Sequence, residues 1–223
     1  MSILLRGALI EYGSDFLGPI PNVVIFQFNP ETLTRNIEIP SRPTGSAGRE
    51  SNQAGDAPVE KISLTAHFSA ADDLGDDKIL ARAFGIGPQL AALEQMARPL
   101  AGLSGLIGEA LDGIGDALGL GGDDAPDQPT PRESYPKILF VWGLTRILPV
   151  IIESMSITEQ KFDHLLNPVQ AEVSLGLAVS AGDFCPPDDI AEGALTYSNM
   201  AKEAQAMLNL VNTASQVVDL VSF

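Results

Sequence analysis

Strict alternation of apolar and polar residues in two segments is the feature that most constrains how this chain can fold. Apolar residues occupy every second position within residues 61–68 and again within residues 170–179. They are Ile62, Leu64, Ala66 and Phe68, followed by Ala171, Val173, Leu175, Leu177 and Val179. Because successive side chains of a β-strand point to opposite faces, a period of two predicts strands that bury one face and expose the other. The fold class is therefore expected to be mainly β.

Four further segments are predicted to be strands because each is short, apolar and bounded by turn residues. They are residues 3–12, 23–28, 138–142 and 148–157. In the second segment, Val24, Phe26 and Phe28 are expected to share one face. The run from Ile138 to Trp142 is apolar at every position, which is typical of a strand that is covered on both faces.

A helical period replaces the period of two after Asp76. It predicts short helices around residues 79–84 and 90–97, and an acidic amphipathic helix over residues 103–118. The chain should therefore divide into three parts. These are a β domain formed by residues 1–75 and 133–187, a helical insertion with an acidic Gly- and Pro-rich linker over residues 76–132, and a C-terminal amphipathic helix over residues 188–223.

The predicted C-terminal helix carries apolar residues at alternating spacings of four and three, which is the pattern of a heptad seam. The seam residues are Met200, Ala204, Met207, Val211, Ala214, Val218 and Val221. Such a seam packs either on the β domain of its own chain or on a helix of a partner. The sequence leaves both alternatives open.

Composition and charge exclude several classes of function. The chain has 13 Lys and Arg residues against 29 Asp and Glu residues, a formal net charge of -16. Polyanionic partners would be repelled, so binding to nucleic acid or to an anionic membrane surface is not expected. Only Cys185 is present, which fits a reducing compartment, and the N-terminal residues lack the pattern of an export signal.

Residue patterns typical of catalysis are missing from the sequence. The two histidines, His67 and His164, have no spacing that would build a zinc site, and the glycines match no phosphate-binding loop. The clustered carboxylates at residues 72–77 and 123–127 do not follow the ligand order of an EF-hand, and they are better explained as helix capping and linker solvation. We therefore predict no catalytic residue, no cofactor and no metal.

Three stretches resemble, in the same order, the contractile injection system tube protein family. Residues 24–33, Val-Ile-Phe-Gln-Phe-Asn-Pro-Glu-Thr-Leu, look like the FNPxxL motif at a strand end of that family, and residues 140–143 and 150–179 supply the other matches. The residues that carry the resemblance are Phe26, Phe28, Asn29, Pro30, Leu33, Trp142, Phe162, Asn167 and Pro168. Physically the motif ends a strand, because Asn29 can bond to neighbouring backbone and Pro30 lacks a ladder donor.

The resemblance implies a tube-protein-like β-barrel or sandwich that assembles as a homo-hexamer. Such a ring would connect the inner tube to the spike or baseplate hub of a contractile injection system or phage-tail-like particle, assembled in the cytoplasm and released with the particle. The implied partners are the inner tube protein, the spike or hub protein, and sheath or baseplate subunits.

Family members that act as tube-to-baseplate adaptors commonly carry a LysM module after the barrel, and here the heptad helix stands in its place. The alternatives are therefore an inner-tube layer protein and, from a different class, a monomeric β-barrel carrier of an apolar ligand. An enzyme that uses His67 or His164 with a carboxylate is a further rival.

Overall fold

The computed structural model describes residues 5–12, 22–40, 58–71, 79–98, 135–180 and 187–221, apart from the side chains of residues 211, 212 and 214–221. The predicted helix over residues 103–118, the acidic clusters at residues 72–77 and 123–127, and Cys185 lie outside these ranges. So do the seam side chains of Val211, Ala214, Val218 and Val221.

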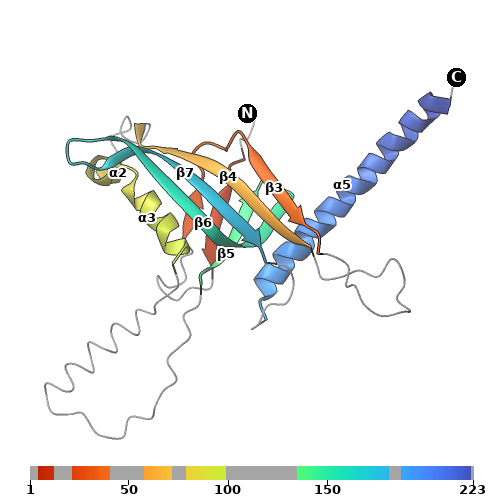
Figure 1. Ribbon diagram of the computed structural model, residues 1–223, viewed down its shortest axis with the longest axis horizontal. Helices are drawn as coiled ribbons and strands as arrows, with labels where there is room; N and C mark the ends of the chain where they lie inside the picture. The colour runs from red at the N-terminus through yellow and green to blue at the C-terminus, as the bar shows by residue number, and fades with distance from the viewer. Residues whose placement is uncertain are drawn as a thin grey trace, which may run out of the picture.

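The fold is mainly β and consists of one seven-stranded antiparallel sheet with a few helices (Figure 1). The strands are β1 (Ala8–Tyr12), β2 (Val23–Ile25), β3 (Leu33–Glu38), β4 (Val59–Ser69), β5 (Lys137–Trp142), β6 (Arg146–Phe162) and β7 (Pro168–Val179). Their order across the sheet is β2-β1-β5-β6-β7-β4-β3. The helices are α2 (Ile79–Phe84), α3 (Gly87–Met96) and α5 (Asp189–Val221).

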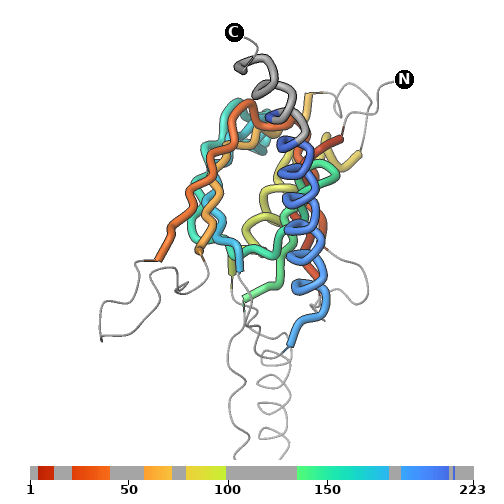
Figure 2. Tube along the Cα trace, turned by 90° about the vertical axis from the view of Figure 1, so that its right-hand side faces the viewer, coloured from red at the N-terminus to blue at the C-terminus, as the bar shows by residue number. Residues whose placement is uncertain are grey.

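The sheet must curl, because its two edge strands are consecutive in the chain. Phe28, three residues after the end of β2, forms an isolated antiparallel bridge with His67 of β4. In a flat sheet β2 and β4 would lie five strand spacings apart, about 24 Å, whereas three residues span at most about 11 Å. Figure 2 shows the result, with β3 and β4 on one side of the curl and β1 and β5 on the other.

The inside of the curl holds the apolar core. The alternating residues of β4 and β7 that the sequence singled out are all buried, which confirms both strands and their faces. Helix α3 adds Leu90, Leu93 and Met96 to the same core. The side-chain amide of Asn22 holds α3 in place by donating to the carbonyl of Ala92 and to the carboxylate of Glu11 on β1.

Besides the bounds of β1, which begins at Ala8, and of β6, which runs from Arg146 to Phe162, the structure differs from the sequence predictions at three strands. Strand β2 ends at Ile25, so Phe28 lies on the outer surface instead of joining Val24 and Phe26 in the core. Strand β5 is fully buried only at Ile138 and Phe140, because its other face is partly open. Strand β3 was not predicted at all.

The two short helices predicted around residues 79–84 and 90–97 correspond to α2 and α3. Between them Gly85 has a φ of +59°, a conformation that L side chains rarely adopt. A Cβ at this position would also collide with the carbonyl oxygen of Pro168, which accepts a hydrogen bond from the N–H of Ile86. The turn between the helices therefore lies directly against the start of β7.

Replacing Gly85 tests this close approach. We expect Gly85→Ala to lower the free energy of unfolding by about 2–4 kcal/mol, because the methyl group meets both an unfavourable φ and the Pro168 carbonyl. Gly87→Ala is the matched control, since a Cβ there meets nothing within 4 Å. Chemical denaturation of both variants checks the difference, and equal stability of the two would contradict the assigned contact.

Candidate functional site

The structure contains two surfaces that a neighbouring molecule could cover: the exposed edge strands of the sheet and the C-terminal helix.

Asn29 ties the segment after β2 to the segment before β1. Its Oδ1 accepts the N–H of Gly7 at 2.9 Å, and its Nδ2 donates to the carbonyl of Leu5 at 2.8 Å. The sequence predicted that Asn29 would bond to neighbouring backbone, but its partners lie more than twenty residues earlier in the chain. Pro30 is buried and Leu33 is partly buried against the core.

Asn167 plays the same part at the turn between β6 and β7. Its Nδ2 donates to the carbonyl of Ala83 at the end of α2 and to the carboxylate of Asp163. Pro168 follows it and accepts the bond from Ile86. Phe162, at the end of β6, is exposed. Both Asn-Pro pairs of the resemblance therefore join a strand end to a segment that is distant in sequence.

Of the aromatic residues of the resemblance, Phe26 is buried in the core and Trp142 packs against it, whereas Phe28 and Phe162 are exposed. The rings of Phe140 and Trp142 stack with their centroids 5.9 Å apart, and Phe26 is fully buried. A Cβ at Gly7 would lie 2.7 Å from the indole of Trp142 and 2.8 Å from the ring of Phe26. Gly7 therefore lets the first chain segment lie flat on these rings, a role that the sequence did not reveal.

Both edge strands expose large apolar side chains. Val23 and Ile25 of β2 are exposed, as is Ile37 of β3, while Ile39 just after β3 is 82% exposed. Within the described residues, no further strand pairs with the outer edge of β2 or β3. Edge strands of soluble monomers usually carry charges or prolines that discourage pairing. Strand β3 also carries Arg35 and Glu38, but β2 has no charged residue, and the exposed apolar side chains of both edges are suited to contact with another protein surface.

Helix α5 is docked on the sheet through a buried serine. Ser198 is fully buried, and its hydroxyl accepts the N–H of Ile147 at 2.9 Å and donates to the carbonyl of the same residue at 2.6 Å. Strand β7 ends at Val179, opposite Val150 of β6, so it stops three residues short of Ile147. The N–H of Ser180 still bonds to the carbonyl of Pro149, and beyond that point the serine side chain supplies the partners that a longer β7 would give to Ile147.

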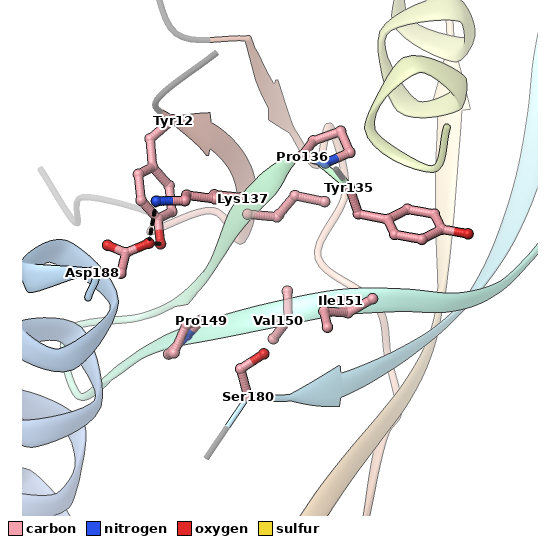
Figure 3. Close-up of a pocket in the computed structure, with 10 residues that line it drawn as sticks. Tyr12, Tyr135, Pro136, Lys137, Pro149, Val150, Ile151, Ser180 and Asp188 are labelled. Carbon is pink, nitrogen blue, oxygen red and sulfur yellow. Dashed lines mark hydrogen bonds and ion pairs between the residues drawn. The ribbon is translucent and has the colours of Figure 1, made fainter. Parts of the chain in front are cut away.

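Asp188 fixes the start of α5. Its Oδ1 accepts the N–H of Ala191 as a helix cap, and its Oδ2 lies 3.0 Å from Nζ of Lys137 and accepts the hydroxyl of Tyr12. Figure 3 shows both side chains directed at this carboxylate, in a pocket of about 180 Å³ between β1, β5, β6 and α5. Three donors occupy the carboxylate, so its role is to hold the helix.

Lys202 forms the last anchor of α5. Its Nζ lies 3.2 Å from Oε2 of Glu60 on β4, and Oε1 of the same carboxylate lies 2.6 Å from Nε of Arg35 on β3. Burial alone would raise the pKa of Glu60, but the hydrogen bonds from Arg35 and Lys202 outweigh it and lower the pKa. The helix is therefore joined to β3 and β4 as well as to β6.

The predicted heptad seam faces away from the sheet wherever its side chains are described. Met200 and Met207 are 65% and 66% exposed, and Ala204 is exposed as well. Met207 follows the buried Ser198 by nine residues, about two and a half helical turns, so the two lie on opposite sides of α5. Of the two alternatives, packing on its own domain is therefore wrong for these three residues.

Acid should weaken the attachment of α5. Burial raises the pKa of Asp188, but the bonds from Ala191, Lys137 and Tyr12 outweigh burial and lower it overall. A lowered folded-state pKa gives stability that is present above the unfolded-state pKa of about 3.9 and is lost as the pH falls through the folded-state value. The stability difference between wild type and Asp188→Asn should therefore be largest near neutral pH and shrink below pH 4. Denaturant titrations at several pH values measure it, and a difference that grows on acidification would contradict this assignment.

Ser198→Ala should destabilise the protein, because it leaves the N–H and the carbonyl of Ile147 without their partner. We expect a loss of about 1–3 kcal/mol, measured by denaturant unfolding. Asn199→Ala, at the neighbouring exposed position, is the control and should change stability little. Similar values for the two variants would show that the Ser198 contact contributes nothing special.

Comparison with known proteins adds no relative to this description. Neither a protein-family model nor a curated protein matches the chain. In the part of the chain that the structure describes, no helix combines the length and the apolar content needed to cross a membrane.

Proposed function

We propose that the protein is a non-catalytic structural component of a contractile injection system or phage-tail-like particle. In this proposal six copies form a ring that connects the inner tube to the spike or baseplate hub. Each copy contributes a tube-like β domain, with residues 76–132 as a helical insertion and α5 as a C-terminal extension. The partners would be the inner tube protein, the hub protein, and sheath or baseplate subunits.

The observation that carries the proposal is the pair of apolar sheet edges. Val23, Ile25 and Ile37 lie exposed on edge strands whose outer backbone groups have no partner strand in the described residues. A closed ring of identical subunits covers such edges without leaving an open end. An obligate interface of this kind buries roughly 2,000 Å² or more. The resemblance of residues 24–33, 140–143 and 150–179 to the tube protein family supports the same assignment.

The structure favours a ring component over a carrier of an apolar ligand. A carrier barrel needs an interior space for its ligand. Here the inside of the curled sheet is occupied by Leu90, Leu93 and Met96 of α3, which pack against the strands. The polar partners of Asn29 and Asn167 are likewise groups of the same chain, namely backbone groups and the carboxylate of Asp163. These motif residues shape the subunit that would enter a ring.

The oligomeric state of the purified protein tests the proposal. We expect size exclusion with light scattering to give a mass of six copies or a multiple of six. Ile25→Lys combined with Ile37→Lys should shift the protein to monomers, because charges on both edges oppose contact. The thermal unfolding of this variant should stay close to that of the wild type, since both side chains are at least half exposed.

Leu144→Lys is the matched control for the edge variant. Leu144 is 69% exposed in the turn between β5 and β6, and it belongs to neither edge strand. Its replacement adds one positive charge where the edge variant adds two, and it should leave the assembly intact. A wild-type protein that stays monomeric at high concentration would overturn the ring, and a control that dissociates as fully as the edge variant would remove the role assigned to the edges.

A further inference from the structure

We propose that the part of α5 beyond its last anchor, residues 203–221, forms a parallel helical bundle with the same segment of neighbouring copies. This segment is called the free half of α5. The inference rests on the proposed ring, because a ring brings identical helices together, and it specifies which part of the chain joins the copies besides the sheet edges. It also assigns the partner of the heptad seam.

The free half of α5 leaves the sheet entirely. Figure 1 shows the helix running well past the strands toward the C-terminus. The anchors at Asp188, Ser198 and Lys202 all lie in or before its first four turns, and from Glu203 onward every side chain that the structure describes is exposed. About 19 residues of helix therefore extend roughly 28 Å beyond the anchored part. In proteins most of the stability of a helix comes from packing of its apolar face, so this exposed length of helix favours a packing partner.

The apolar face of the free half is wider than a two-stranded seam. Leu208 and Leu210 are 71% and 68% exposed, and they flank Met207 on its two sides. In heptad terms these positions border the seam, where two-stranded coiled coils usually carry charged residues. Val217 falls at the position of Leu210 one heptad later. Apolar residues on both flanks suit a helix that contacts two neighbours, one on each side, as every helix of a cyclic bundle does.

The charge of this segment favours other copies of the chain as its occupant. Residues 203–221 contain no basic residue and two acidic residues, Glu203 and Asp219, which gives 0 − 2 = −2. The whole chain carries a formal charge of -16. The helix is thus nearly free of the like charge that would keep copies apart, and it presents no charged face that would select an oppositely charged partner.

Cyclic symmetry fixes the geometry of such a bundle. Subunits related by rotation about one axis hold their α5 helices with the same polarity and at the same height. Met207 of one copy should therefore lie close to Met207 of the next copy. Asn209, nearly half a turn away from Met207 around the helix, should face solvent.

Cross-linking of the full-length protein tests this register. In a Cys185→Ala background, Met207→Cys and Asn209→Cys each place a single thiol on α5. A short bismaleimide should join copies through the Met207→Cys variant many times faster than through the Asn209→Cys variant, as read from covalent dimers on a denaturing gel. Equal rates at the two positions would overturn the bundle.

Charge substitutions provide the second arm. Leu208→Glu with Leu210→Glu should abolish cross-linking at Met207→Cys, whereas Gln205→Glu with Asn209→Glu adds the same charge on the opposite face and should preserve it.

Light scattering on the same samples separates this inference from the ring. Hexamers that do not cross-link through Met207→Cys would overturn the bundle and leave the ring standing. Hexamers that survive the edge substitutions but dissociate with Leu208→Glu and Leu210→Glu would support the bundle and contradict assembly through the edges. Monomers without cross-links would overturn both.

Discussion

Backbone hydrogen-bonding groups at the borders of the sheet must find partners, and this requirement shapes the rest of the molecule. Residues beyond the end of β2 reach β4, where Phe28 bridges His67 and bends the sheet into a curl. At the short end of β7, the hydroxyl of Ser198 completes the ladder for Ile147. The outer edges of β2 and β3 have no such partner strand in the described residues, and they carry apolar side chains. The proposed ring would meet the remaining requirement by supplying neighbouring copies.

Local side-chain chemistry joins the separate segments around this sheet. The two Asn-Pro pairs use one device: the amide of Asn29 or Asn167 bonds to backbone far away in the sequence, and the proline that follows ends further pairing. Glycine allows the close approaches that go with it. Gly7 lies under the ring of Trp142, and Gly85 touches the carbonyl of Pro168. The motif is thus a joint between segments and not only the end of a strand.

The sequence predicted the parts of the fold in which periodicity reflects burial. Strands β4 and β7 are interior strands with one face in the core, so their alternation was plain. Strand β3 is an edge strand on which only Leu33 and Arg35 are partly buried, so it has no apolar stripe to detect. Phe28 was misplaced because the change of partner from β1 to β4 leaves no local pattern.

The anchors of α5 differ in how far the sequence could have revealed them. Asp188, just before the helix, is a recognisable capping residue. Ser198 lies within the helix, where a serine gives no sign that it completes a β-ladder, and Lys202 pairs with a residue 142 positions earlier in the chain. Contacts of this kind depend on the three-dimensional arrangement, and periodicity carries no information about them.

The placement of its anchors makes α5 a lever. Asp188, Ser198 and Lys202 hold only the first part of the helix, and every side chain that the structure describes in the remainder is exposed. With an arm of about 28 Å, a tilt of about 10° at the anchored part moves the far end by roughly 5 Å. A small change in the curvature of β6 is therefore magnified at the C-terminus, and a pull on the C-terminus is delivered to a serine, a lysine and an aspartate near the base of the arm.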